Sequence, residues 1–188
     1  MRHGETWFNV KKIKQGFCDS PLTENGIEQA ITAGKWFNQN NILFGSGYTS
    51  ELNRTKNTIK YVAPNLGFKS FVELNEWNFG SAEGDPAIKH EHIKFPFGNY
   101  FVELGGENQQ QVRSRTKFIM NKIAEEDFNE NILVVSHGRI LREFSDLHLL
   151  NSKVERPKNM FNCIVFKFEY ETTNKTWKFV EIIKTDTN

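Results

Sequence analysis

Apolar residues recur at helical spacing in four stretches of the chain. Thr23 is suited to cap a helix, and Ile27, Ala30 and Ile31 follow it at the spacing of one helix face. A second stretch with this spacing stops before Pro64, because proline cannot continue a helix. The predicted helices cover roughly residues 24–38, 52–63, 109–126 and 139–149.

Short extended segments lie between these helices. The stretches 46–49, 71–74 and 132–136 are predicted to be strands. Strands therefore alternate with helices through most of the chain. This order predicts an α/β layered fold with a mostly parallel sheet.

The last part of the chain has strand periodicity instead. Residues 162–171 and 176–183 alternate apolar and polar side chains around a turn at 172–175. This pattern predicts a hairpin that closes one edge of the sheet.

The segment 85–106 has no sustained period and is long for a connection inside a compact domain. Such segments are often lids or binding loops. We expect its aromatic residues to pack within the loop, and its basic residues are candidates for contacts to the non-reacting end of a substrate. The aromatic residues are Phe95, Phe97, Tyr100 and Phe101, and the basic ones are Lys89, His90, His92 and Lys94.

Composition narrows the class of protein. The 188 residues are 38% hydrophobic, which fits a single domain over residues 1–188. A formal net charge of +1 gives no basis for nucleic-acid binding, and no apolar run approaches the ~18 residues of a membrane span. Cys18 and Cys163 lack metal-ligand spacing. We therefore expect a cytoplasmic protein that contacts neither nucleic acid nor membrane.

Two histidines stand in similar local sequences. Arg2-His3-Gly4 opens the chain, and Ser136-His137-Gly138 directly follows the apolar run 132–135. A guanidinium presents a planar fork of donors to phosphate, and glycine lets an oxyanion approach the backbone. An imidazole in this setting can attack phosphorus. The motifs therefore favour a phosphohistidine enzyme.

Further segments complete an ordered set of motifs between residues 2 and 145. Arg2–Thr6 with Asn9 resembles RHGE[ST]xxN, and Ser136–Gly138 resembles a second-histidine motif. The other matches are Gln15–Thr23 with QGxxDxPLT, Ser50–Arg54 with SxLxR, Leu74–Gly84 with LxExxFGxxEG, and Gly105–Glu107 with GGE. Together they resemble the histidine phosphatase superfamily, in its phosphoglycerate mutase-like branch.

The resemblance implies a role for each matched residue. His3 would be phosphorylated, and it must be neutral to attack, a state that neighbouring arginines favour. A partly buried Glu76 would give a proton to the leaving oxygen and later take one from water. The implied site consists of catalytic His3, Glu76 and His137, and of substrate-binding Arg2, Asn9, Gln15, Gly16, Arg54 and Gly138. No metal or cofactor is required.

The resemblance also implies a three-layer phosphoglycerate mutase-like fold with helices on both faces of the sheet. Family members place a short apolar strand before the first motif, in the middle of the sheet, whereas only Met1 precedes Arg2 here. We therefore expect the first central strand to be missing, with an open slot and unpaired backbone groups on its two neighbours. A truncated or incorrectly assigned start is our hypothesis for this departure.

The leading functional prediction is a phosphatase that hydrolyses a small phosphorylated metabolite through a phosphohistidine. One alternative is a 2,3-bisphosphoglycerate-dependent phosphoglycerate mutase, in which the phosphohistidine returns its group to a bound intermediate. The other is an inactive module that binds a phosphorylated ligand. The sequence carries no signal for the particular ester or for an oligomeric state.

Overall fold

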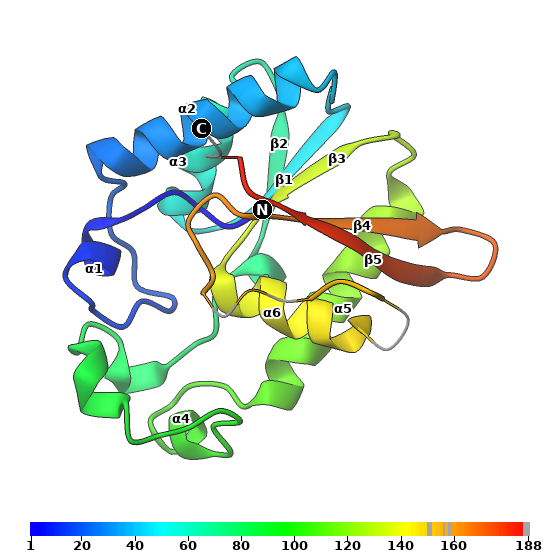
Figure 1. Cartoon of the computed structure of the whole chain (residues 1–188). Helices are drawn as coiled ribbons and strands as arrows, with labels where there is room; N and C mark the ends of the chain where they lie inside the picture. Colours follow the sequence, from blue (N-terminus) through cyan, green and yellow to red (C-terminus); the bar gives the residue numbers. More distant parts are fainter. Residues whose placement is uncertain (150–151, 156, 158, 186–188) are drawn as a thin grey trace.

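A three-stranded parallel sheet forms the centre of the fold (Figure 1). This computed structural model describes residues 1–149, 152–155, 157 and 159–185. The strands are β1 (Ser46–Ser50), β2 (Phe68–Phe71) and β3 (Ile132–Val135), in the order β2-β1-β3. Gly47 of β1 lies opposite Phe68 on one side and Leu133 on the other, and both pairings are parallel.

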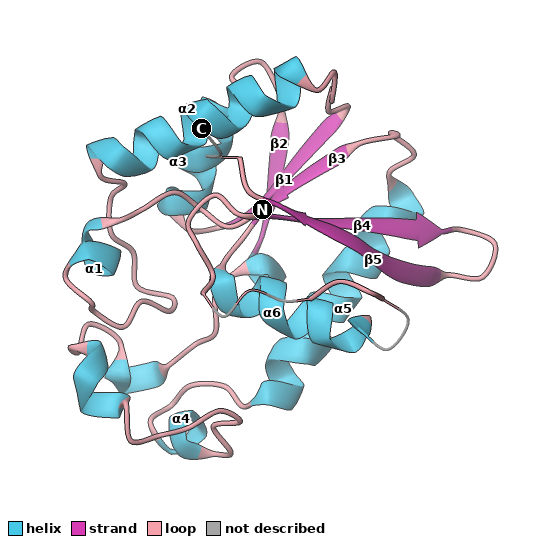
Figure 2. Cartoon of the chain, viewed as in Figure 1, coloured by secondary structure: helices cyan, strands magenta, loops and turns pink. Residues whose placement is uncertain are grey.

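Helices cover both faces of this sheet (Figure 2). The long helices are α2 (Glu24–Gln39), α3 (Asn53–Val62), α5 (Gln109–Glu126) and α6 (Gly138–Leu147). Leu133 and Val135 point to one face and are buried against α2 and α3. Val134 points to the other face and packs against Ile119 and Ile123 of α5. The predicted three-layer α/β fold is confirmed.

The hairpin at the end of the chain is present, but it does not close an edge of the parallel sheet. Strands β4 (Val165–Glu171) and β5 (Thr176–Ile183) pair with each other in a separate two-stranded antiparallel sheet. Phe166 and Phe179 from this hairpin pack on Leu141 of α6. The predicted edge position is wrong, because residues 1–3 lie between β3 and the segment that enters β4.

The amino terminus lies in the middle of the molecule (Figure 1). The Met1 nitrogen donates to the Val134 carbonyl at 2.8 Å, and the His3 amide donates to the Ser136 carbonyl at 3.0 Å. On the opposite side of this segment, the Arg2 amide donates to the Ile164 carbonyl. Three residues therefore bridge β3 and the start of β4.

Below this bridge the two strands separate around a cavity of about 670 Å³, which we call the slot. Its walls include Ile132–Val134 of β3, Val165–Glu169 of β4, and the side chains of Met1 and Phe37. In the described part of the chain, backbone bonds on this edge of β3 extend only from Val134 to Ser136. The predicted open slot is therefore present.

The four predicted helices are confirmed, but one strand was misplaced. The segment 71–74 was predicted as a strand, whereas β2 is Phe68–Phe71 and Val72–Leu74 forms a short 3-10 helix, η1. The apolar Val72 is 45% exposed, so hydrophobicity alone misled the prediction. Strand β2 is positioned instead by its parallel pairing with β1.

Residues 85–104 contain only the short helices η3 (Ala87–His90) and α4 (Tyr100–Glu103), as the lack of a period predicts. Two further short helices lie outside this segment, α1 (Trp7–Val10) and η2 (Gly80–Ala82). Phe97, Tyr100 and Phe101 pack with Trp77 and Phe79 in one cluster, which confirms local packing for most of the aromatic residues of the loop. None of the helices within the described ranges is long and apolar enough to cross a membrane.

Candidate active site

The two motif histidines meet at the carboxyl end of the parallel sheet. Their ring centroids are 5.3 Å apart, and His3 and His137 are 3% and 0% exposed. The bond from the His3 amide to the Ser136 carbonyl fixes this approach. The sequence prediction that both rings belong to one site is consistent with this placement.

The hydrogen bonding of His3 defines which ring nitrogen is free. Its Nδ1 lies 2.7 Å from the Gly4 carbonyl oxygen, which can only accept, so Nδ1 carries the proton. The lone pair is therefore on Nε2. Burial, and then the charges of Arg54 and Arg2, hold the pKa of His3 well below 6.5. His3 is thus a neutral imidazole whose Nε2 is available as a nucleophile.

His137 is also held as a neutral ring. Its Nδ1 accepts from Arg54 Nε at 3.3 Å, so its proton lies on Nε2, 2.8 Å from the Ser50 hydroxyl oxygen. Burial and the charge of Arg54 lower the pKa of His137 well below its ordinary value. A protonated His137 that donates to phosphate therefore requires an anion nearby to favour its protonation.

Arg54 is 1% exposed and binds protein more than it faces solvent. Its Nη1 donates to the Cys18 carbonyl and the Asp19 carboxylate, and its Nη2 donates to the Gly16 carbonyl. With Nε directed at His137, a single Nη2 hydrogen lacks a partner among the described residues. Arg54 therefore helps to fix the loop 16–19 and has one donor left for a ligand.

Two amide side chains in the site have free donors. Asn9 Oδ1 accepts from the Thr6 amide and from Asn162 Nδ2. The Nδ2 hydrogens of Asn9 have no hydrogen-bond partner among the described residues. Gln15 Oε1 accepts from the Thr6 hydroxyl, and Gln15 Nε2 is buried with no partner among the described residues. A buried donor without an acceptor is costly, so an oxyanion is a suitable occupant.

The glycines of the motifs serve backbone packing more than anion access. A Cβ on Gly4 would lie 2.4 Å from the Gly26 carbonyl oxygen, and one on Gly16 would lie 2.1 Å from Glu83 Oε1. A Cβ on Gly138 would meet only Arg2, at an ordinary 3.6 Å. The expectation that the glycine after a motif histidine serves close approach of an oxyanion therefore has no support at Gly4, whereas the space at Gly138 is compatible with it.

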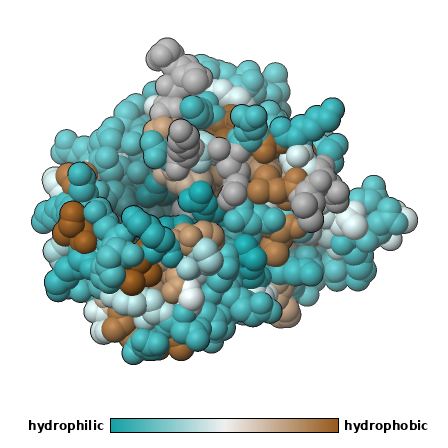
Figure 3. Space-filling model, turned by 60° about the horizontal axis from the view of Figure 1, so that its bottom comes forward, coloured by the Kyte–Doolittle hydropathy of each residue, from teal (hydrophilic) through white to brown (hydrophobic). Residues whose placement is uncertain are grey.

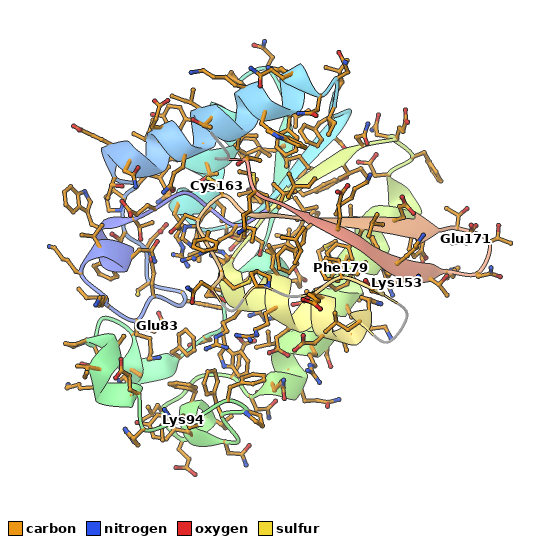
Figure 4. The ribbon with its side chains drawn as sticks, in the orientation of Figure 1. Glu83, Lys94, Lys153, Cys163, Glu171 and Phe179 are labelled. Atoms are coloured by element: carbon orange, nitrogen blue, oxygen red, sulfur yellow. The ribbon has the colours of Figure 1, made fainter. Side chains whose placement is uncertain are left out.

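Glu83 explains the tight packing at Gly16. Its carboxylate accepts from the amides of Phe17 and Cys18 at 2.8 and 2.6 Å, and from the Phe79 amide at 3.0 Å. Figure 4 shows Glu83 between the loop after α1 and the segment that contains η2. Glu83 therefore fixes the loop 16–19, which Arg54 also holds.

Glu76 is buried at 8% exposure, as expected for a proton donor shielded from water. Its Oε1 accepts from the Trp77 amide at 2.9 Å and its Oε2 from the Arg139 amide at 3.3 Å. Four cations interact electrostatically with this carboxylate, namely Arg2, Arg54, Lys14 and Arg139. Its charge therefore balances part of a strongly cationic site. Arg2 also donates to the Met160 carbonyl.

Sequence reasoning missed two residues that shape the site. Arg115 donates to the carbonyls of Glu73, Asn75 and Glu76, and it pairs with the Glu107 carboxylate at 2.7 Å. It therefore fixes the backbone that carries Glu76. A charged residue at an apolar position of the predicted helix 109–126 was the available signal. Ser50, the partner of His137, gave no separate signal.

The other three histidines lie outside this arrangement. His90 contacts Asp85 and Tyr100 within the 85–104 segment, and His148 packs against Phe144 with ring centroids 4.7 Å apart. The His92 ring packs against Tyr100, with ring centroids 5.9 Å apart. All three rings therefore pack against local neighbours.

A three-layer fold with two buried histidines among arginines at the carboxyl end of its sheet defines a phosphoglycerate mutase-like protein. The sequence model of the histidine phosphatase superfamily (branch 1) matches residues 1–183. The chain belongs to this superfamily.

Its relatives include both mutases and phosphatases. It is 30% identical over 156 residues to the 2,3-bisphosphoglycerate-dependent phosphoglycerate mutase of Afipia carboxidovorans, covering 76% of this chain and 75% of that one. It is 35% identical over 127 residues to fructose-2,6-bisphosphatase TIGAR of Mus musculus, covering 62% of this chain but 46% of TIGAR.

Solved structures agree with the fold. Phosphoglycerate mutase from Bacillus anthracis superimposes with a TM-score of 0.81 at 24% identity, covering 95% of this chain and 88% of that one. A putative alpha-ribazole-5'-P phosphatase from Escherichia coli gives a TM-score of 0.63 at 30% identity, covering 75% and 73%. Relatives with different reactions therefore share this architecture.

Proposed function

We propose that this chain is a phosphatase that hydrolyses a small phosphorylated metabolite through a phosphohistidine at His3. The observation that carries the proposal is the hydrogen bond from His3 Nδ1 to the Gly4 carbonyl, which leaves Nε2 as the nucleophile beside Arg2 and Arg54. Depression of the pKa of His3 keeps this nitrogen unprotonated without a strong base.

In the first step, His3 Nε2 attacks phosphorus and the bond from phosphorus to the ester oxygen breaks. The protonated form of Glu76 gives its proton to the departing alkoxide, which leaves as an alcohol. The charge that develops on the phosphoryl oxygens is stabilised by Arg2, by the remaining Arg54 donor and by Gln15 Nε2. The product of this step is a phosphohistidine with an ionised Glu76.

In the second step, Glu76 takes a proton from water as the water oxygen attacks phosphorus. The bond from phosphorus to Nε2 breaks, inorganic phosphate leaves, and Glu76 regains the proton it needs for the next cycle. One carboxyl therefore serves both half-reactions. The amides of Trp77 and Arg139, which donate to the Glu76 carboxylate, keep it in place from one half-reaction to the next.

A phosphoglycerate mutase is the second candidate, favoured by the mutases among the sequence relatives. In a mutase, phospho-His3 transfers its phosphoryl group to a bound monophosphate rather than to water. This transfer is the reverse of the first step described above. The two reactions differ in the acceptor of the phosphoryl group, so they are separated by following the products.

The test is hydrolysis of p-nitrophenyl phosphate between pH 5 and 8 with EDTA present, beside an assay of 3-phosphoglycerate isomerisation with and without 2,3-bisphosphoglycerate. We expect phosphate release that EDTA does not diminish. Isomerisation that depends on the bisphosphate, with slow phosphate release, would replace the phosphatase by the mutase. Phosphate affinity without either activity would indicate a binding module.

A further inference from the structure

Two cations beside the proposed site lack a direct ion pair within the part of the chain that the structure describes. Arg139 and Lys14 both interact with Glu76 electrostatically, yet neither forms an ion pair with a carboxylate among the described residues. They take no part in the two steps proposed above. Their position next to the proton donor places them where the non-reacting part of an ester would extend.

Arg139 lies against the 85–104 segment. Its guanidinium carbon is 4.8 Å from the centre of the Phe97 ring and 5.5 Å from that of Phe95. Its Nη1 is buried and has no hydrogen-bond partner within the described residues. A desolvated guanidinium hydrogen without an acceptor costs free energy, and an anionic oxygen recovers it.

Lys14 lies at the other end of the same aromatic cluster. Its Nζ is 4.6 Å from the centre of the Phe79 ring and 5.0 Å from that of Phe101. Burial and repulsion from Arg139 lower the pKa of Lys14, and Glu76 opposes this effect. The Arg139 amide donates to Glu76 Oε2 at 3.3 Å, so both residues lie beside the same carboxylate.

Adjacent aromatic rings connect the positions of the two cations. Phe97 and Phe101 have centroids 5.1 Å apart, and Phe101 and Phe79 have centroids 4.8 Å apart, so the rings form a continuous wall from Arg139 to Lys14. Figure 3 views the molecule with its lower side turned forward, where separate hydrophobic patches are surrounded by hydrophilic surface.

We propose that Arg139 and Lys14 together bind a second anionic group of the substrate, a carboxylate or a second phosphate, while the first phosphate reacts at His3. This inference rests on the proposed function and adds the substrate class: short phosphate esters that carry another negative charge. Esters that end in a hydroxyl group would leave the two cations unpaired and would be poorer substrates.

The test compares kcat/KM for two esters of matched size, 2-phosphoglycolate and 2-hydroxyethyl phosphate. Ethane-1,2-diol bisphosphate is added to distinguish a carboxylate from a phosphate as the second anion. Arg139→Met and Lys14→Met remove the charges and keep most of the stem. Arg142→Met on the same helix and Lys11→Met in the same loop are the matched controls.

We expect one of the doubly anionic esters to be preferred over 2-hydroxyethyl phosphate by about tenfold or more, the range of charge-assisted hydrogen bonds. Arg139→Met and Lys14→Met should each reduce this preference by lowering kcat/KM for the anionic ester more than for 2-hydroxyethyl phosphate, and the controls should retain it. Equal use of all three esters, or equal losses on charged and neutral esters, would overturn the inference.

Calorimetric binding to the His3→Ala variant separates this inference from the proposed function. Tighter binding of an anionic ester, lost in His3→Ala/Arg139→Met, supports the second-anion site even if the wild type turns over no ester. Equal affinities for the charged and neutral esters would refute it even if the wild type is an active phosphatase.

Discussion

The carboxyl end of β3 and the slot both lie along the same strand. They differ in how completely their polar groups are hydrogen-bonded. At the carboxyl end, His137, Ser50 and Arg54 are fully buried and hydrogen-bonded to one another. In the slot, Ile132–Val134 borders a cavity of about 670 Å³, and Met1 places an ammonium group against the Val134 carbonyl.

This difference teaches that the site and the sheet are stabilised by separate means. The loop 16–19, Glu83 and Arg115 hold the proposed catalytic groups through hydrogen bonds that do not pass through the slot. Residues 1–3 supply the ladder bonds that the site itself needs. We therefore expect changes in the slot to alter stability and changes at the carboxyl end to alter turnover.

The largest effect should follow from His3→Ala. Loss of the nucleophile should reduce phosphate release to below about 1% of wild type, because no other group can accept the phosphoryl group in line. The Tm should change little, since the hydrogen bond of the ring is made only to the carbonyl of the adjacent Gly4 among the described residues. His148→Ala, outside the site, is the control. Activity well above this level would identify His137 as the nucleophile.

Glu76→Gln should produce a loss that depends on the leaving group. An alkoxide needs a proton, whereas p-nitrophenolate leaves without one, so kcat/KM, which reports the first step, should fall about 100-fold with an alkyl phosphate and by less than about tenfold with the aryl ester. Steady-state kinetics with both esters measures the difference. Equal losses would remove Glu76 from the role of acid.

Filling the slot should affect stability alone. An extension of about five apolar, β-branched residues ahead of Met1 has the length of a typical strand and can pair with β3. We expect Tm to rise by about 10 °C, corresponding to several kcal/mol for a chain of this size, with kcat changed less than about threefold. A polar extension of equal length is the control, and an equal rise with both would contradict the account.

The two regions should also lose stability in different pH ranges. Burial lowers the pKa of the Met1 ammonium group from 8.0 to about 5, and that of both catalytic histidines below 6.5. The unfolded chain therefore binds more protons as pH falls, first at Met1 and then at the histidines, and the free energy of unfolding decreases. We expect Tm to decline by several degrees from pH 8 to 5.

The apolar extension sharpens this test, because it eliminates the buried ammonium group. The decline between pH 8 and 6.5 should disappear, and the decline below 6.5 should remain. An unchanged dependence of Tm on pH would show that the Met1 ammonium group does not contribute. A Tm that is constant at all pH values would show that the histidines do not contribute either.

Periodicity and motifs predicted the parts of the structure that depend on local sequence. The helix at Gln109–Glu126 and the strands of the hairpin follow their apolar spacing. Strand β2 did not, because pairing with β1 rather than local hydrophobicity determines its position. The role of Arg115 was also hidden, since the carbonyls it binds lie about forty residues earlier in the chain.

The most direct test of the account is to trap the phosphoryl group on the protein. The chain is mixed briefly with p-nitrophenyl phosphate, quenched at high pH, where phosphohistidine persists, and its peptides are mapped by mass spectrometry. We predict one added phosphoryl group on His3, absent in His3→Ala and accumulating in Glu76→Gln because water attack is slowed. A label on His137, or turnover with no labelled peptide, would contradict the account.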